Sequence, residues 1–164
     1  MCSKSVGRKN RQLTWGGPQV LYNGGLQQAR VRYYDAQRRR PGLPAGVAAL
    51  VSCIEPHATV VELINLDPGQ DRTVIVQSGA FAEHSIEHVG YTACTDASWI
   101  GGLYDYGHGT PVISDREADV DGPWLTVRLP ASTRIRLTLR LIMHCRRPSY
   151  VTPFDDASQA KRPC

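Results

Sequence analysis

The most regular pattern of the chain lies in residues 134–144, RIRLTLRLIMH. A period of two places successive side chains on opposite faces of a β-strand, so one face here is apolar and the other is polar. Only Ile142 interrupts the alternation. The segment therefore predicts a strand of an antiparallel sheet with one packed face and one solvated face. Its inward residues are Ile135, Leu137, Leu139, Leu141 and Met143.

Two hairpins are expected in the chain after residue 58. Residues 59–66 and 72–77 (TVVELINL and RTVIVQ) are rich in β-branched residues, and DPGQD at 67–71 supplies a turn between them. Residues 124–129 (WLTVRL) alternate again, and the Pro-Ala-Ser turn after them predicts pairing with 134–144 as a closing hairpin.

Other segments carry weaker signals. Asn23-Gly24 predicts a hairpin within residues 13–34, because this pair tolerates the positive φ of a tight turn. Residues 47–54 (VAALVSCI) suit a helix or a strand, with the helix slightly favoured. Residues 83–91 predict another strand. The Gly- and Asp-rich stretch 92–121 has no period and predicts a long loop that either is functional or has lost its structural context.

Six or more short strands joined by Gly, Pro and Asp turns predict an all-β fold, an antiparallel β-sandwich. A jelly-roll or cupin-like barrel is the alternative. The 164 residues suit one domain. We expect a disordered basic tail over 1–12, the β-sandwich domain over 13–154 and a disordered tail over 155–164.

The composition is ordinary for a soluble globular protein and less basic than that of dedicated nucleic-acid-binding modules. Apolar residues make up 41% and the net charge of +4 is mild, which permits an anionic partner without requiring one. The five cysteines are odd in number and lack CxxC spacing, which favours reduced thiols. No signal peptide and no apolar run of about 20 residues is visible, so we expect a cytoplasmic protein without a membrane span.

Histidines suggest one candidate chemistry. On a strand, His84, Ile86 and His88 would share one face, and two imidazoles there could bind a divalent transition metal. A third ligand would come from His57, His108 or His144. The favoured interpretation is that these are solvated polar positions, and no cofactor is then expected.

An acidic cluster precedes Gly122, namely Asp115, Glu117, Asp119 and Asp121. Alternating carboxylates with a glycine resemble a calcium loop. An EF-hand loop starting at Glu117 would need a bidentate Glu at its twelfth position, where this chain has Arg128. A solvated acidic loop is therefore favoured over a calcium site.

Aromatic residues in the Gly-rich stretch suggest carbohydrate contact. Aromatic faces stack on sugar rings, and a carboxylate beside them accepts hydrogen bonds from hydroxyls. The residues that would form this site are Trp99, Tyr104, Asp105 and Tyr106. Loop packing is the competing interpretation of the same residues.

Outward arginines form the last candidate surface: Arg128, Arg134, Arg136 and Arg140. A sheet face bearing them could bind phosphates, but single-strand binders interleave aromatic residues for base stacking and this strand has none. Nucleic acid is therefore a disfavoured partner. The chain also lacks GxSxG, Walker A, GxGxxG and HExxH motifs, so we do not expect it to be an enzyme by itself.

Four segments carry a family resemblance: LTWGGPQVLYNGG at 13–25, VRYYDAQRRRPGLP at 31–44, TVVELINLDPGQDRTVIVQSGAFAEH at 59–84 and LRLIMHCRRPSYVTPF at 139–154. Together they resemble the C-terminal β-rich region of large bacterial proteins similar to glycoside hydrolases. In such regions a strand ending in an Asn-Leu-x-Pro turn leads into an R-x-V-x-V-Q-x-G strand. The resemblance implies an accessory sandwich packed on an upstream catalytic domain that would hold the catalytic carboxylates.

The leading functional hypothesis is thus a non-catalytic accessory β-sandwich of a carbohydrate-active enzyme, with a structural or weak carbohydrate-binding role. One alternative is a cupin-like metal-dependent enzyme that uses the histidine cluster with His84 and His88. A second alternative is a nucleic-acid-binding module on the arginine-rich face.

Overall fold

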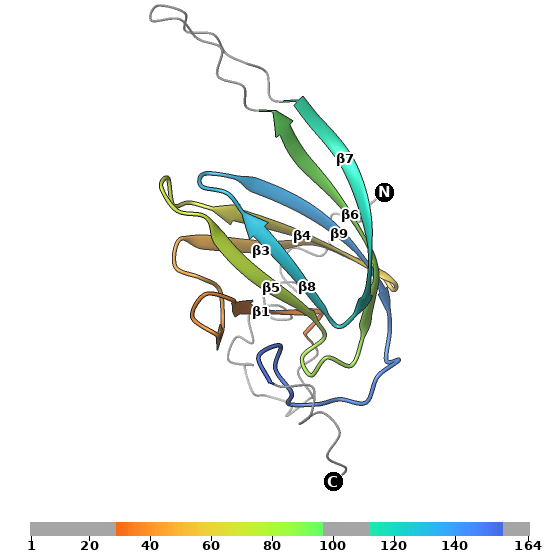
Figure 1. Cartoon of the computed structure of the whole chain (residues 1–164). Coiled ribbons are helices and arrows are strands. Elements are labelled where there is room, and N and C mark those ends of the chain that lie inside the picture. Colours follow the sequence, from red (N-terminus) through yellow and green to blue (C-terminus); the bar gives the residue numbers. More distant parts are fainter. Residues whose placement is uncertain (1–28, 97–111, 156–164) are drawn as a thin grey trace, which may run out of the picture.

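The computed structural model describes residues 29–96 and 112–155, which form β-strands joined by turns (Figure 1). Within these ranges no helix is long and apolar enough to cross a membrane. The strands are β1 (Val31–Asp35), β2 (Arg40–Pro41), β3 (Val47–Ile54), β4 (Ala58–Asn65), β5 (Arg72–Ser78), β6 (Ser85–Asp96), β7 (Val112–Gly122), β8 (Trp124–Leu129) and β9 (Arg134–Ile142).

Two antiparallel sheets pack against each other as a β-sandwich, which confirms the predicted fold class. One sheet has four strands in the order β2-β1-β5-β8, and the other has five in the order β3-β4-β9-β6-β7. Figure 1 shows the pair β6–β7 running on past the other strands of its sheet. The C-terminal segment after β9 turns back toward the end of β1.

The alternation predicted for residues 134–144 is confirmed over residues 134–142, which form β9, whereas Met143 and His144 lie in the turn after it. Leu137, Leu139 and Leu141 are at most 2% exposed, and the residues between them point to solvent. These leucines pack with inward residues of the other sheet, among them Val74 and Val127. Burial of each such aliphatic side chain stabilises the fold by about 1.5–3 kcal/mol, so β9 belongs to the main core of the domain.

Both hairpins predicted after residue 58 are wrong. β4 pairs with β3 and β9, whereas β5 pairs with β1 and β8, so residues 66–71 cross from one sheet to the other. The chain crosses back between β8 and β9, which are likewise not paired with each other. Turn residues indicate that the chain reverses, but both a hairpin and a crossover between sheets reverse it.

Three further expectations need correction or lie partly outside the described residues. Residues 47–54 form the edge strand β3 rather than the favoured helix, because pairing with β4 overrides weak helix propensity. The stretch 92–121 is not one loop, since β6 continues to Asp96 and β7 begins at Val112. Residues 1–28, with most of the predicted first hairpin and the basic tail, and the tail 156–164 are outside the described ranges.

The outer face of the four-stranded sheet is covered near β1. Gln77 is 1% exposed, and its Oε1 accepts hydrogen bonds from the Tyr34 hydroxyl (3.0 Å) and from Trp124 Nε1 (3.1 Å). The Phe154 ring of the C-terminal segment packs edge-on against the Tyr34 ring at 5.9 Å between centroids. This packing leaves the outer face of the five-stranded sheet as the more open of the two.

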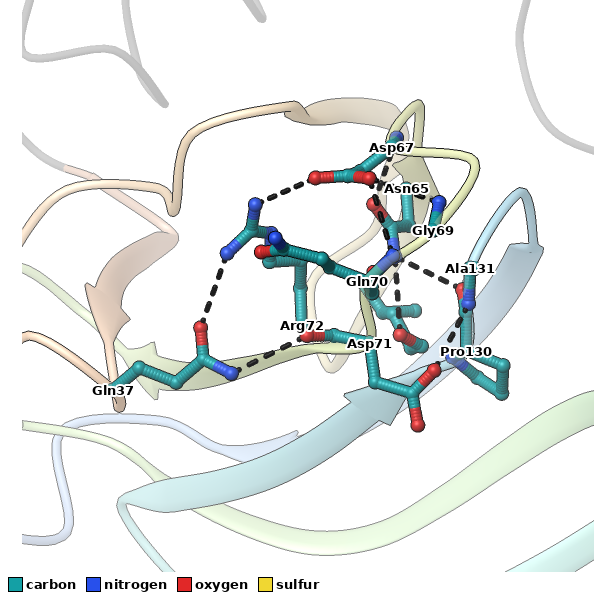
Figure 2. Close-up of polar contacts among 10 residues, drawn as sticks. Gln37, Asn65, Asp67, Gly69, Gln70, Asp71, Arg72, Pro130 and Ala131 are labelled. Carbon is teal, nitrogen blue, oxygen red and sulfur yellow. Dashed lines mark hydrogen bonds and ion pairs between the residues drawn. The ribbon is translucent and has the colours of Figure 1, made fainter.

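Asn65, the last residue of β4, ties the two crossovers together. It is 1% exposed, and its Nδ2 donates to the carbonyls of Gln70 (2.8 Å), Leu129 (3.2 Å) and Pro130 (3.0 Å). Its Oδ1 accepts from the backbone N–H of Asp67. One amide therefore satisfies backbone groups of both crossovers, as Figure 2 shows.

Two aspartates of the first crossover extend this network (Figure 2). Asp67 accepts from the N–H of Gly69 and forms an ion pair with Arg72 at 2.6 Å, and these contacts lower its pKa. Asp71 accepts from Arg128 at 2.8 Å and from the N–H of Ala131, and the bond from Arg128 is the larger cause of its lowered pKa. Side chains of the first crossover thus hold the backbone of the second.

We predict that Asn65→Ala destabilises the protein by about 2–3 kcal/mol, because it leaves buried carbonyls without donors. Asn65→Asp should also destabilise, since a carboxylate of the same shape cannot donate. Urea unfolding followed by circular dichroism measures both changes. Gln37→Ala is the control, because it removes only exposed bonds, one to the Asp71 carbonyl and one from Arg72, and should cost less than about 0.5 kcal/mol. Equal stability of Asn65→Ala and the control would contradict the proposed role.

Candidate functional site

The candidate site lies on the outer face of the β9–β6–β7 part of the five-stranded sheet. A bulge interrupts β6 between Ile86 and His88. Because of this extra residue, Ile86 and Val89 both point into the core, while His88 faces outward beside Asp119 of β7 and Arg140 of β9. The single face predicted for His84, Ile86 and His88 is therefore wrong.

His88 is held between two carboxylates of β7. Its Nδ1 lies 2.9 Å from Asp119 Oδ1, and its Nε2 lies 3.2 Å from Glu117 Oε2. The hydrogen bond to Asp119 is the largest cause of a raised pKa for His88, and Glu117 adds to it. The imidazolium form is thus favoured on this face, and it links β6 to β7.

An open groove with a cavity volume of about 470 Å³ lies between β9 and β7, over β6. Gly90 and Thr138, which are paired across β6 and β9, form its floor. Gly90 has no side chain, and a Cβ built there would lie 3.9 Å from the Thr138 Cβ. The absent side chain is one reason why this part of the sheet is hollow.

The two walls of the groove differ in charge, since arginines stand on β9 and carboxylates predominate on β7. Arg136 and Arg140 stand on β9, while Asp115 and Glu117 stand on β7, where Asp115 also accepts a hydrogen bond from the Thr92 hydroxyl at 3.1 Å. Arginine supplies several N–H donors and carboxylates supply only acceptors. The groove therefore offers donors along β9 and the acceptors Asp115 and Glu117 along β7, where Arg116 also lines it.

A second cavity, of about 610 Å³, adjoins this groove through Arg140. The β3–β4 turn contributes Glu55 and His57, and the bulged residue Glu87 of β6 contributes another carboxylate. Ile142, the residue that interrupts the polar side of β9, lines this cavity as well and is 46% exposed. The open face thus continues along β9 beyond the first groove.

His84 belongs to a buried corner rather than to this face. It is 3% exposed, its Nδ1 accepts the backbone N–H of His144 at 3.0 Å, and its ring packs edge-on against the His144 ring. Burial lowers its pKa. The neighbouring Glu83 carboxylate accepts the N–H groups of Ala80 and Phe81 within the β5–β6 loop. The backbone carbonyls of Glu83 and Phe81 accept the N–H groups of Arg146 and Ser149, which holds this loop against the segment after β9.

The predicted metal ligands are consequently separated by the bulge and by burial. Within residues 29–96 and 112–155, no group of three or more His, Cys, Asp or Glu side chains is placed to hold a metal ion. His57 lines the second cavity, whereas His108 lies outside the described residues. Metal binding by His84 and His88 stays a prediction.

The predicted sugar-binding residues Trp99, Tyr104, Asp105 and Tyr106 all lie in 97–111, outside the described residues. This segment joins the end of β6 to the start of β7. The predicted carbohydrate site therefore belongs to the same hairpin that carries the groove. The acidic cluster also belongs to it, but on strand β7 rather than in the predicted loop.

The predicted arginine face is divided. Arg128 lies on β8 of the four-stranded sheet and pairs with Asp71, whereas Arg134 lies on β9 and pairs with Glu62. Arg136 and Arg140 have no ion pair or hydrogen bond of their side chains in the described part of the chain, and both are exposed. The groove was missed in the sequence because its two walls are about 20 residues apart and the bulge at Glu87 has no signature.

The expectation of reduced thiols is wrong for Cys53, which is disulfide-bonded. Cys145 is a free thiol and is exposed. Comparisons with known proteins add no relative: no family model, no curated protein and no solved structure matches this chain. The resemblance to the accessory region of glycoside-hydrolase-like proteins therefore stays a prediction.

The buried corner predicts a stability loss in mild acid. Because the folded-state pKa of His84 is lowered, the unfolded chain binds more protons below about pH 6.5, and unfolding becomes easier as the pH falls. His84→Gln keeps an oxygen that can accept the His144 N–H but cannot be protonated. We expect its free energy of unfolding to fall less between pH 7.5 and 5.5 than that of the wild type. An equal fall in both proteins would contradict this role.

His88 predicts the opposite pH dependence. Its folded-state pKa is raised, so its contribution is present below the unfolded value of about 6.5 and is lost as the pH rises through the folded value. His88→Gln should therefore be more destabilising at pH 5.5 than at pH 8.5. The effect is small because Glu117 and Asp119 are solvent-exposed. Urea titrations of both proteins at the two pH values measure it, and a larger effect at pH 8.5 would refute it.

Proposed function

We propose that this chain is a non-catalytic accessory β-sandwich of a carbohydrate-active enzyme and that it binds carbohydrate. The observation that carries the proposal is the polar groove of the five-stranded sheet, with donors on β9 and acceptors on β7. Sugar hydroxyls both donate and accept hydrogen bonds, so a surface that offers both kinds of partner suits them. The groove lies on the hairpin whose connecting segment contains the aromatic residues.

The aromatic residues would supply the second requirement of sugar binding. Trp99, Tyr104 and Tyr106 offer flat apolar faces for C–H stacking, and Asp105 offers an acceptor between them. Carboxylates and arginines by themselves hold a neutral sugar weakly because water competes for the same hydrogen bonds. The proposal therefore assigns stacking to the segment 97–111 and hydrogen bonding to the groove.

The charges of the groove favour carbohydrate over the alternatives. A nucleic acid would bring phosphates close to Asp115, Glu117 and Asp119 as well as to the arginines, and the carboxylates would repel them. A cupin-like metal site would need His84 and His88 on one face, whereas the bulge separates them. In the proposed function, catalysis belongs to an upstream domain and this module positions the substrate or supports that domain.

We predict that Trp99→Ala and Tyr104→Ala each weaken the binding of carbohydrate. A panel of immobilised neutral and acidic glycans, probed with the purified chain, identifies the retained classes, and affinity electrophoresis measures the variants. Each substitution removes a stacking face, so an affinity loss of about tenfold or more is expected.

The matched control is Tyr150→Ala, which removes an aromatic side chain that is 87% exposed, packs on Phe81 and does not line the groove. It should bind as the wild type does. Failure of the wild-type chain to bind any glycan of the panel, or binding that survives both substitutions, would refute the proposal.

A further inference from the structure

We propose that the groove between β9 and β7 selects acidic sugars, and that the carboxylate of a hexuronate residue binds Arg136 and Arg140. This inference rests on the proposed carbohydrate-binding function and deepens it. It names hexuronate-containing glycans as the ligand class and places their binding site on the outer face of β6, β7 and β9.

The first observation is the availability of the two arginines. They flank Thr138 on the same face of β9, and neither side chain has an ion pair in the described part of the chain. Arg134, the next outward arginine of the strand, pairs with Glu62, so the strand keeps free cations only at the groove. Arginine binds carboxylates through two parallel N–H···O bonds, which makes it the side chain suited to a uronate.

The second observation is the pair of carboxylates on β7, on the other side of the groove from the arginines. Asp115 and Glu117 face the arginines across Gly90, and the acidic side chain of Asp119 engages His88 at one end. A ligand with charge on every side, such as inorganic polyphosphate or a nucleic acid, would be repelled by this wall. A hexuronate places its single carboxylate on one side of the ring and hydroxyl donors on the other, which matches the two walls.

The third observation concerns size and shape. A volume of about 470 Å³ falls within the range of small-ligand sites, about 300–1,000 Å³, and suits a short segment of a glycan. The hollow over Gly90 lets a sugar ring approach the sheet between the walls. The adjoining cavity at Arg140 extends the same track along β9, so a chain of sugars can continue there.

The test titrates the whole chain with trigalacturonate and triglucuronate, with galactotriose as the neutral counterpart, by calorimetry at low salt. Arg136→Gln/Arg140→Gln should weaken uronate binding by about tenfold or more, because two charged hydrogen-bond donors are lost. Gly90→Val fills the hollow and should weaken binding as well. The fold should tolerate this substitution, because valine suits a strand and its Cβ meets Thr138 only at ordinary contact distance.

The control for charge is Arg146→Gln/Arg147→Gln, which removes the same two positive charges from exposed positions outside the groove. It should bind uronate as the wild type does. Circular dichroism and urea unfolding of each variant verify that the fold is retained, so that a loss of binding reports on the groove.

The outcomes separate this inference from the proposed function. Uronate binding that is absent, that survives the groove variants, or that falls equally in the charge control overturns the inference. If neutral glycans are retained through Trp99 and Tyr104 while the groove variants change nothing, the accessory function stands and the acidic selectivity is wrong. Stronger binding of inorganic phosphate than of either uronate at the groove would also overturn it.

Discussion

The amide of Asn65 is the contact on which the arrangement of this sandwich depends. The chain changes sheets after β4 and again after β8, and Asn65 donates to backbone carbonyls of both connections. Buried carbonyls at a sheet corner have no strand to pair with, so a side chain must satisfy them. Asp67 and Asp71 add exposed contacts around the same point (Figure 2). These bonds hold together connections that are far apart in the sequence.

The second crossover determines where β9 lies. By leaving β8 for the other sheet, the chain inserts β9 between β4 and β6, in the centre of the five-stranded sheet. The inward leucines of β9 complete the core, and its outward arginines then face the carboxylates of β7 across β6. A closing hairpin with β8 would have placed Arg136 and Arg140 in the other sheet. The groove is thus a product of the topology rather than of one local motif.

The sequence predicts what depends on nearest neighbours and misses what depends on distant partners. Period-two patterns located β4, β5, β8 and β9, and burial confirms the inward residues of β9. The predicted pairing of β4 with β5 is wrong because the turn residues DPGQD suit a hairpin loop and a crossover equally. The bond that ties this crossover to the other one joins Asn65 to Leu129, which is far away in the sequence. The bulge at Glu87 places His88 outward and Ile86 inward, and no glycine or proline in the sequence indicates it. The aromatic sugar site remains a prediction from sequence.

The central position of β9 is tested most directly by interstrand proton contacts in the NMR spectrum of the labelled protein. The account predicts contacts between Val61 and Leu137 and between Val89 and Leu139, because β9 pairs with both β4 and β6. It also predicts that β8 contacts β5, as in the pair Val74 and Val127. A ladder of contacts between β8 and β9 in the register of a hairpin would contradict the topology and remove the basis of the groove.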